Sequence, residues 1–211
     1  MKAIAPYVNF SNQIERHKNH LPHWQQEGVL QFVTWHLGDA LPVSARRKIM
    51  FERAQWLKAH PQPWDPETEK DYFTTFDGRI QNWLDQGMGN CWLRDSMICE
   101  LVAKSFHFQD ARTYNLDSYV IMPNHVHILF EPINDSPLEK IIRDIKGFTS
   151  HRINKYLKRK GTFWMEDYWD RMIRGETHYL RVRRYMKENP TKAKIPEGSF
   201  GLWMSEEKSW G

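Results

Sequence analysis

Cysteine and long apolar runs are scarce in this chain of 211 residues, and their scarcity excludes several classes of protein. Only Cys91 and Cys99 occur, in neither a metal nor a redox spacing, so a disulfide scaffold is excluded and a reduced, cytoplasmic setting is expected. No apolar stretch approaches the length that spans a bilayer, and residues 1–6 lack the apolar core of a secretion signal, so no membrane partner is expected. Internal repeats and low-complexity segments are also missing. We therefore expect a single globular domain over residues 1–211.

Acidic residues thin out within the stretch from Arg143 to Lys187, where aromatic residues lie between the basic ones. The net charge is only +4, so the distribution of charge is more informative than its total. Basic side chains surrounded by aromatic ones fit a phosphate-backbone partner, although a solvated helix face is the alternative for any such run. The candidate DNA-binding residues are Arg143, Lys146, Arg152, Arg171, Arg174, His178, Arg181 and Arg184.

Hydrophobic periodicity predicts an α+β protein. Strands are expected at 29–37, 112–122, 124–131, and at 163–165 with 169–173. Helices are expected at 44–59, 66–86, 95–106, 137–161 and 176–189, the last ending against Pro190 because the residue before a proline disfavours the helical conformation. The order is that of a ferredoxin-like βαββαβ fold with an antiparallel sheet, a helical insertion at about 44–90 after the first strand, and an additional C-terminal helix.

Two histidines lie two residues apart within a segment of strand character. Alternate residues of a strand share a face, so His125 and His127 should point the same way, with Val126 between them on the other face. Two imidazoles that converge are half of a metal site. The alternative is an ordinary pair of surface or core histidines.

The C-terminal helix contains the residues that could complete such a site. Tyr185 and Asn189 are four residues apart and so project from one helical face, with His178 about two turns earlier. Asn189 would supply an oxygen to the two imidazoles, and a tyrosine beside a metal can act as a nucleophile. The alternative is that Tyr185 is a core aromatic and that Asn189 merely precedes Pro190.

These residues belong together chemically because a phenol with a pKa near 10 is a poor nucleophile at neutral pH. A divalent ion that polarises the scissile phosphate, with Arg181 and Arg184 nearby, would stabilise the phenolate and the transition state. Attack would form a phosphotyrosine and free a 3′ hydroxyl, with no nucleotide cofactor. A ligand set of two nitrogens and one oxygen suits Mn²⁺ better than Mg²⁺. Phosphate oxygens of the bound DNA would add the oxygen ligands that Mg²⁺ prefers.

Five short blocks of the sequence are similar to the REP-associated tyrosine transposases, which are HUH single-strand nucleases of the IS200-like group. The blocks are LPHW at 21–24, GNCWLRD at 89–95, YVIMPNHVHILF at 119–130, DYWDRMIR at 167–174 and YMKENPTKA at 185–193, so the likeness covers about 22–193. The resemblance implies a ferredoxin-like fold, with His125, His127 and Asn189 as ligands of Mg²⁺ or Mn²⁺ and Tyr185 as the nucleophile. It also implies recognition of a hairpin beside a single-stranded tetranucleotide in repeated palindromic DNA, and a monomer is preferred over a dimer.

The sequence departs from that family in three places: Lys194 stands where a glycine is expected, the tail 196–211 has no clear match, and the segment 46–88 is long. Three alternatives remain. A histidine-triad hydrolase would need a third histidine where Leu129 stands, and a replication initiator or relaxase would usually be a longer chain. A domesticated protein that binds hairpin DNA without cutting it is the third, because activity cannot be inferred from sequence.

Overall fold

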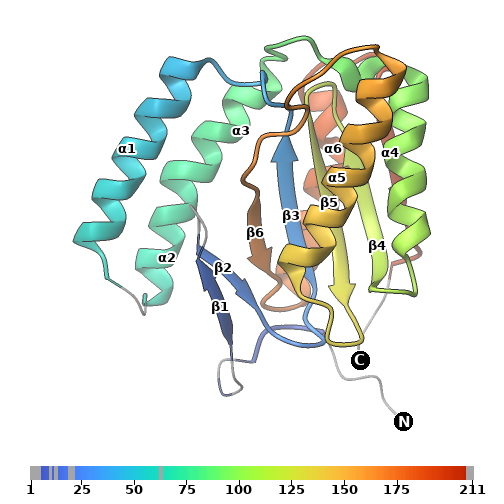
Figure 1. The fold of residues 1–211 in the computed structure, drawn as a ribbon. Helices are drawn as coiled ribbons and strands as arrows, with labels where there is room; N and C mark the ends of the chain where they lie inside the picture. The colour runs from blue at the N-terminus through green and yellow to red at the C-terminus, as the bar shows by residue number, and fades with distance from the viewer. Residues whose placement is uncertain (1–5, 10, 12–13, 19–21, 62–63, 208–211) are drawn as a thin grey trace.

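The fold is built around an antiparallel sheet whose strand order is β6-β3-β5-β4-β7 (Figure 1). The computed structural model describes residues 6–9, 11, 14–18, 22–61 and 64–207. The strands are β3 (Gln31–His36), β4 (Tyr114–Ile121), β5 (His125–Pro132), β6 (Trp169–Met172) and β7 (Gly201–Met204). Without β7, this order is that of a ferredoxin-like sheet, which confirms the predicted fold class.

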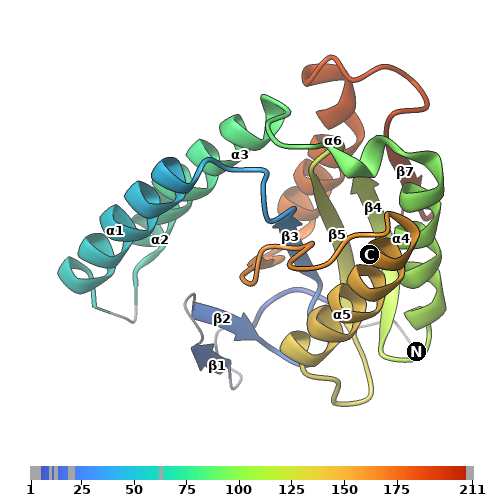
Figure 2. The same cartoon turned by 45° about the horizontal axis from the view of Figure 1, so that its top comes forward.

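Three helices cover the two faces of this sheet. Helices α4 (Ser96–Gln109) and α5 (Leu138–Tyr156) cross over between strands and pack side by side on one face, whereas α6 (Glu176–Lys192) lies on the other (Figures 1 and 2). Asp95 begins α4 where the sequence predicts, since its carboxylate accepts hydrogen bonds from the backbone N–H groups of Met97 and Ile98.

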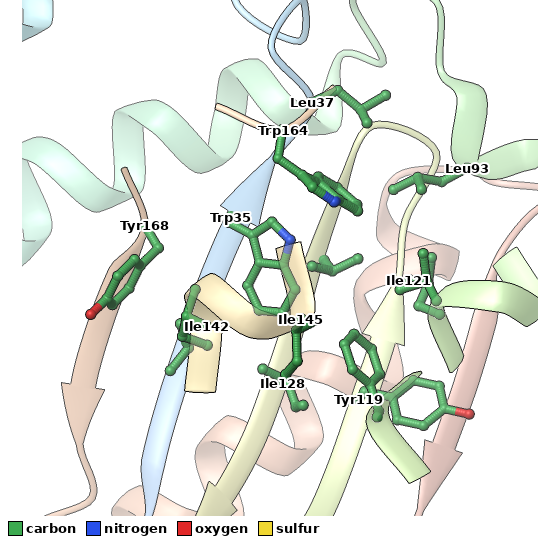
Figure 3. Packing of buried hydrophobic residues seen from close by; sticks show 14 of the residues in the cluster. Trp35, Leu37, Leu93, Tyr119, Ile121, Ile128, Ile142, Ile145, Trp164 and Tyr168 are labelled. Carbon is green, nitrogen blue, oxygen red and sulfur yellow. The ribbon is translucent and has the colours of Figure 1, made fainter. Parts of the chain in front are cut away.

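The face beneath α4 and α5 is the main hydrophobic core. Trp35 from β3 is fully buried there, with Ile128 from β5 and Ile142 and Ile145 from α5 around it (Figure 3). Trp164 contacts Trp35 edge to face, with 6.0 Å between ring centroids. On the strands the core residues occupy every second position, Val33 and Trp35 on β3 and Val126 and Ile128 on β5, which is the pattern expected when one face of a sheet is buried.

The opposite face has a smaller apolar cluster, which holds α6. Val120 and Leu129 project from β4 and β5 towards Tyr179 and Met186 of α6. Arg183 of α6 is also buried, and its guanidinium donates to the Asp117 carboxylate at 2.6 Å. The helix that contains Tyr185 is therefore fixed to the sheet by apolar packing and by a buried ion pair.

A helical insertion separates β3 from α4. It consists of α1 (Val43–Ala59), α2 (Pro66–Tyr72), one π-helical turn at Phe73–Asp77 and α3 (Gly78–Asp85), followed by a short 3-10 turn at Trp92–Arg94. The helices extend to one side of the sheet (Figures 1 and 2). Aromatic rings join them to one another: Trp56 of α1 contacts Trp64 edge to face and Tyr72 at a tilt, with 5.1 Å between ring centroids in each pair.

The structure corrects three expectations about individual elements. Helix α6 does not end before Pro190 but continues to Lys192, because the bond from Ala193 N to Asn189 O maintains the last turn. Residues 163–165 form only an isolated bridge, between Trp164 and Leu37, rather than part of the last strand. The tail forms β7, and a separate hairpin, β1 (Glu15–Lys18) with β2 (Pro22–Gln25), precedes the sheet.

None of the helices in the described part of the chain combines the length and the apolar character needed to cross a bilayer. Of the block LPHW, Leu21 lies outside the described residues.

Candidate active site

Both histidines of β5 project from the sheet face that α6 covers. His125 and His127 are buried, and their ring centroids are 4.8 Å apart. They lie on the face opposite to Val126 and Ile128, which belong to the main core. The alternation of the strand therefore places the two imidazoles together, as predicted.

Hydrogen bonds hold each imidazole by its Nδ1 atom. His125 Nδ1 donates to Asn124 Oδ1 at 2.7 Å, and Asn124 Nδ2 in turn donates to the backbone oxygens of Leu84 and Met88. The orientation of Asn124 is thus set by the end of the insertion, and the lone pair of the His125 ring is on Nε2. His127 Nδ1 lies 2.6 Å from Thr34 Oγ1, a residue of the neighbouring strand β3. Fixing one ring nitrogen in this way leaves the other available as a ligand.

Tyr185 and Asn189 lie beside the second nitrogen of His127. Its Nε2 atom is 3.4 Å from the Tyr185 hydroxyl and 3.2 Å from Asn189 Nδ2. The ring of Tyr185 contacts the His127 ring edge to face, with 5.3 Å between centroids. Asn189 is buried, yet its Oδ1 atom has no hydrogen-bond partner. A buried carbonyl oxygen without a partner is costly, so this atom requires an explanation.

The chemistry of this donor set fits a divalent cation. Burial lowers the pKa of His127 to about 3 and that of His125 well below its ordinary value, so both rings are neutral at physiological pH, the state in which imidazole binds metals. Over the described residues, no three His, Cys, Asp or Glu side chains cluster as a metal site. The buried, unpartnered Asn189 Oδ1 beside His127 is the candidate for a further protein ligand.

A groove of about 680 Å³ opens beside Tyr185. One wall comes from β3, β6 and α6, and the other from the insertion, with Thr74, Gly78 and Gln81. Four of the candidate DNA-binding residues line it: Arg171, Arg174, His178 and Arg181. Burial, followed by the charges of those three arginines, lowers the pKa of His178 to about 4, so the groove's positive charge at neutral pH comes from arginine.

The other candidate DNA-binding residues lie elsewhere. Arg143 and Arg152 are on α5, across the sheet from the histidines, where both line a different hollow between α4 and α5. Lys146 donates to the backbone oxygen of Glu166 at 2.5 Å, and burial lowers its pKa to about 8. Arg184 is exposed on α6 outside the groove lining. The sheet thus separates the basic residues of α5 from those of the segment 171–184, so the candidate DNA-binding residues do not form one surface.

Of the three aromatic residues in the segment 164–169, only Trp169 lines the groove. Its ring stacks on His36 with 5.4 Å between centroids. Trp164 is buried in the main core, where its indole N–H donates to Thr149 Oγ1 at 2.8 Å, and Tyr168 is buried in the same core. Those two therefore pack in the interior.

Sequence reasoning missed three polar residues that contact the imidazoles: Thr34, Gln81 and Asn124. Asn124 could have been found, because it adjoins His125 and an amide next to a candidate ligand is a natural hydrogen-bond partner. Thr34 and Gln81 are distant in sequence, and nothing in their local pattern indicates the contact.

The chain is similar to a solved structure and to a family model. No curated protein matches the sequence. A solved structure described as a REP-associated tyrosine transposase bound to a REP hairpin is similar, with 17% identity, a TM-score of 0.43, and coverage of 79% of this chain and 69% of that chain. The family model for IS200-like transposases matches residues 92–189, a segment that contains both histidines, Tyr185 and Asn189. This segment, which is slightly less than half of the chain, is therefore similar to the IS200-like transposase family.

Proposed function

We propose that the protein is a metal-dependent single-strand DNA endonuclease and strand transferase that acts through a covalent 5′-phosphotyrosine. The observation that carries this proposal is the arrangement around His127, whose Nε2 atom is within 3.4 Å of both the Tyr185 hydroxyl and the Asn189 amide. A nucleophile beside a set of metal ligands, at the mouth of an arginine-lined groove, fits phosphate chemistry.

His125, His127 and Asn189 would hold the divalent ion. When bound, the ion would polarise the scissile phosphate and offset the charge that develops on it. Tyr185 Oη would attack the phosphorus while its proton passes to water, forming the phosphotyrosine bond and breaking the bond to the 3′ oxygen. The leaving oxygen takes up a proton and becomes a 3′ hydroxyl. A second 3′ hydroxyl could then attack the phosphotyrosine, which releases Tyr185 and joins the strands.

The groove indicates how a DNA strand would be held. Arg171, Arg174 and Arg181 would bind the phosphates, and Trp169 offers an indole on which an unpaired base can stack. The sequence blocks shared with REP-associated tyrosine transposases extend the proposal to hairpin-forming repeats with an adjacent single strand. We expect single-stranded hairpin DNA to bind better than the matching duplex, with affinity falling steeply as salt rises.

Covalent capture tests this function. The full-length protein is incubated with end-labelled hairpin DNA and Mn²⁺ or Mg²⁺, and adducts are separated on a denaturing gel. We expect an adduct that requires the metal and disappears in Tyr185→Phe, which loses only the hydroxyl and should bind the hairpin as before.

Tyr179→Phe is the matched control. Tyr179 lies on the same helix, but its hydroxyl donates to the buried Asp117 carboxylate at 2.8 Å, away from the histidines. This variant should still form the adduct, although it should be less stable. Adducts from Tyr185→Phe, or their loss only in Tyr179→Phe, would show that the nucleophile is wrongly assigned. Hairpin binding without any adduct in the unmodified protein would favour the silent DNA-binding alternative.

A further inference from the structure

The insertion contacts the candidate metal centre directly. Gln81, on α3, places its Nε2 atom 3.2 Å from His125 Nε2, the ring nitrogen with the lone pair. The two residues are 44 positions apart, and Gln81 also lines the groove beside Tyr185. A polar side chain thus meets His125 at the atom that would bind the ion.

The position of Gln81 is fixed by the packing of its helix and by a hydrogen bond of its own side chain. Ile80 and Leu84, its neighbours on α3, are buried in the main core, so the helix cannot move freely away from the sheet. The Gln81 amide also donates to Asp85 Oδ1 at 2.8 Å, one turn later on the same helix. Asn124, which orients His125, is bonded to the Leu84 backbone. Helix α3 therefore reaches His125 twice, through Asn124 on Nδ1 and through Gln81 on Nε2.

An amide in this place has two chemically distinct ends. Its N–H end suits the lone pair of a neutral imidazole, whereas its carbonyl oxygen suits a cation. Rotation about the terminal bond of a glutamine exchanges the two ends, and this torsion has a broad, two-fold profile. In Gln81 the rotation breaks the bond from Nε2 to Asp85, which the contact between Oε1 and the ion would replace. The two imidazoles and Asn189 form a neutral donor set with a single oxygen, which is poor for a hard divalent ion, so a second amide oxygen would improve it.

We propose that Gln81 of the insertion is a ligand of the metal centre, and that its Oε1 supplies a second amide oxygen to the ion held by His125, His127 and Asn189. This inference rests on the proposed function, since it assumes that the histidines bind a metal. It gives the insertion a role in the site: α3 completes the metal centre from outside the ferredoxin-like core.

Metal affinity measured without DNA tests the inference independently of activity. Mn²⁺ is titrated into the full-length protein and the free ion is followed by its electron paramagnetic resonance signal. Gln81→Ala should weaken Mn²⁺ binding about tenfold or more, as loss of a supporting metal contact commonly does. Gln81→Glu should bind as tightly as the unmodified protein or more tightly, because it keeps an oxygen and adds a charge. Asn82→Ala, which removes an exposed amide from the next position on α3, should change nothing.

The pattern across the variants separates the possible outcomes. Unchanged or tighter Mn²⁺ binding in Gln81→Ala would overturn the inference, and so would weaker binding in Gln81→Glu than in Gln81→Ala. Thermal melts without metal show whether each variant is folded, and Gln81→Glu tests the ligand role even if the alanine variant is unstable. His127→Ala should abolish binding. If His127→Ala binds Mn²⁺ normally, the metal centre of the proposed function is wrong. If His127→Ala loses Mn²⁺ binding but Gln81→Ala keeps it, only the role of Gln81 is wrong.

Discussion

The two faces of the central sheet bury very different side chains. Beneath α4 and α5, strands β3 and β5 bury Trp35, Val126 and Ile128, and the contacts are almost entirely apolar. Beneath α6, the same two strands bury polar side chains, Thr34 from β3 and His125 and His127 from β5. Alternate residues of one strand thus serve two purposes, since one set contributes to folding and the other forms the candidate site.

The comparison shows where the protein tolerates unfavourable burial. Removing polar groups from water without pairing them costs stability, and the α6 face contains an unpartnered carbonyl oxygen on Asn189. The face beneath α4 and α5 contributes most of the apolar area. Stability and chemistry should therefore respond differently to substitutions on the two faces, and three changes measure the difference.

The largest effect is expected beneath α4 and α5. Trp35→Ala removes a fully buried indole that contacts both Phe106 and Trp164. We expect the free energy of unfolding to fall by about 3–5 kcal/mol, because the transfer free energy of the ring is lost and a cavity remains. Chemical denaturation followed by fluorescence and circular dichroism measures this. A loss below about 1 kcal/mol would mean that this face is not the main source of stability.

A smaller effect is expected when an arginine on either face is replaced by alanine. Here the two faces are compared by their contribution to DNA affinity. Arg181 lines the groove beside Tyr185, whereas Arg152 lies on α5 across the sheet, and both are exposed. Arg181→Ala should reduce the slope of log affinity against log salt concentration by about 1, the value for one lost phosphate contact. Arg152→Ala should leave the slope unchanged. Fluorescence anisotropy with labelled hairpin DNA at several salt concentrations distinguishes them, and equal effects would place DNA on both faces.

The smallest effect on stability is expected at Asn189. Asn189→Leu replaces a buried amide that has an unpartnered oxygen with an apolar side chain of similar size. It also removes the contact from Asn189 Nδ2 to His127 Nε2, but the Tyr185 hydroxyl remains beside that nitrogen, so stability should change by less than about 1 kcal/mol. Mn²⁺ binding and adduct formation should nevertheless be lost. Thermal denaturation and metal titration on the same sample test this pair of results. A large loss of stability would show that Asn189 supports the fold rather than the chemistry.

Local spacing accounts for the parts of the site that could be predicted from the sequence. Two residues along a strand place His125 and His127 on one face, and four along a helix place Tyr185 near Asn189. The elements themselves follow from hydrophobic periodicity. These rules act over one or two turns or strand positions, so they hold whatever the rest of the chain does.

The other features of the site depend on how elements that are distant in the sequence pack against one another. Gln81 reaches His125 across 44 residues, and no pattern in α3 indicates that contact. The basic residues of α5 were grouped with those of α6 because they are close in sequence, but the two helices cover opposite faces. Pro190 was expected to end the helix, yet one missing N–H in the last turn is tolerated when the following bonds form.

Strand β7 has a consequence for the behaviour of the chain in solution. It pairs with β4 from Ser118 to Ile121 and so covers an edge that would otherwise present unpaired backbone groups. Beyond it, Ser205 O accepts from the Arg183 guanidinium at 2.7 Å, which fastens the strand to the helix of Tyr185. A chain shortened before Gly201 would expose an open sheet edge that can add strands from other copies, so self-association rather than simple unfolding is the expected defect. We therefore expect the pairing of β7 with β4 to prevent association through this edge of the sheet.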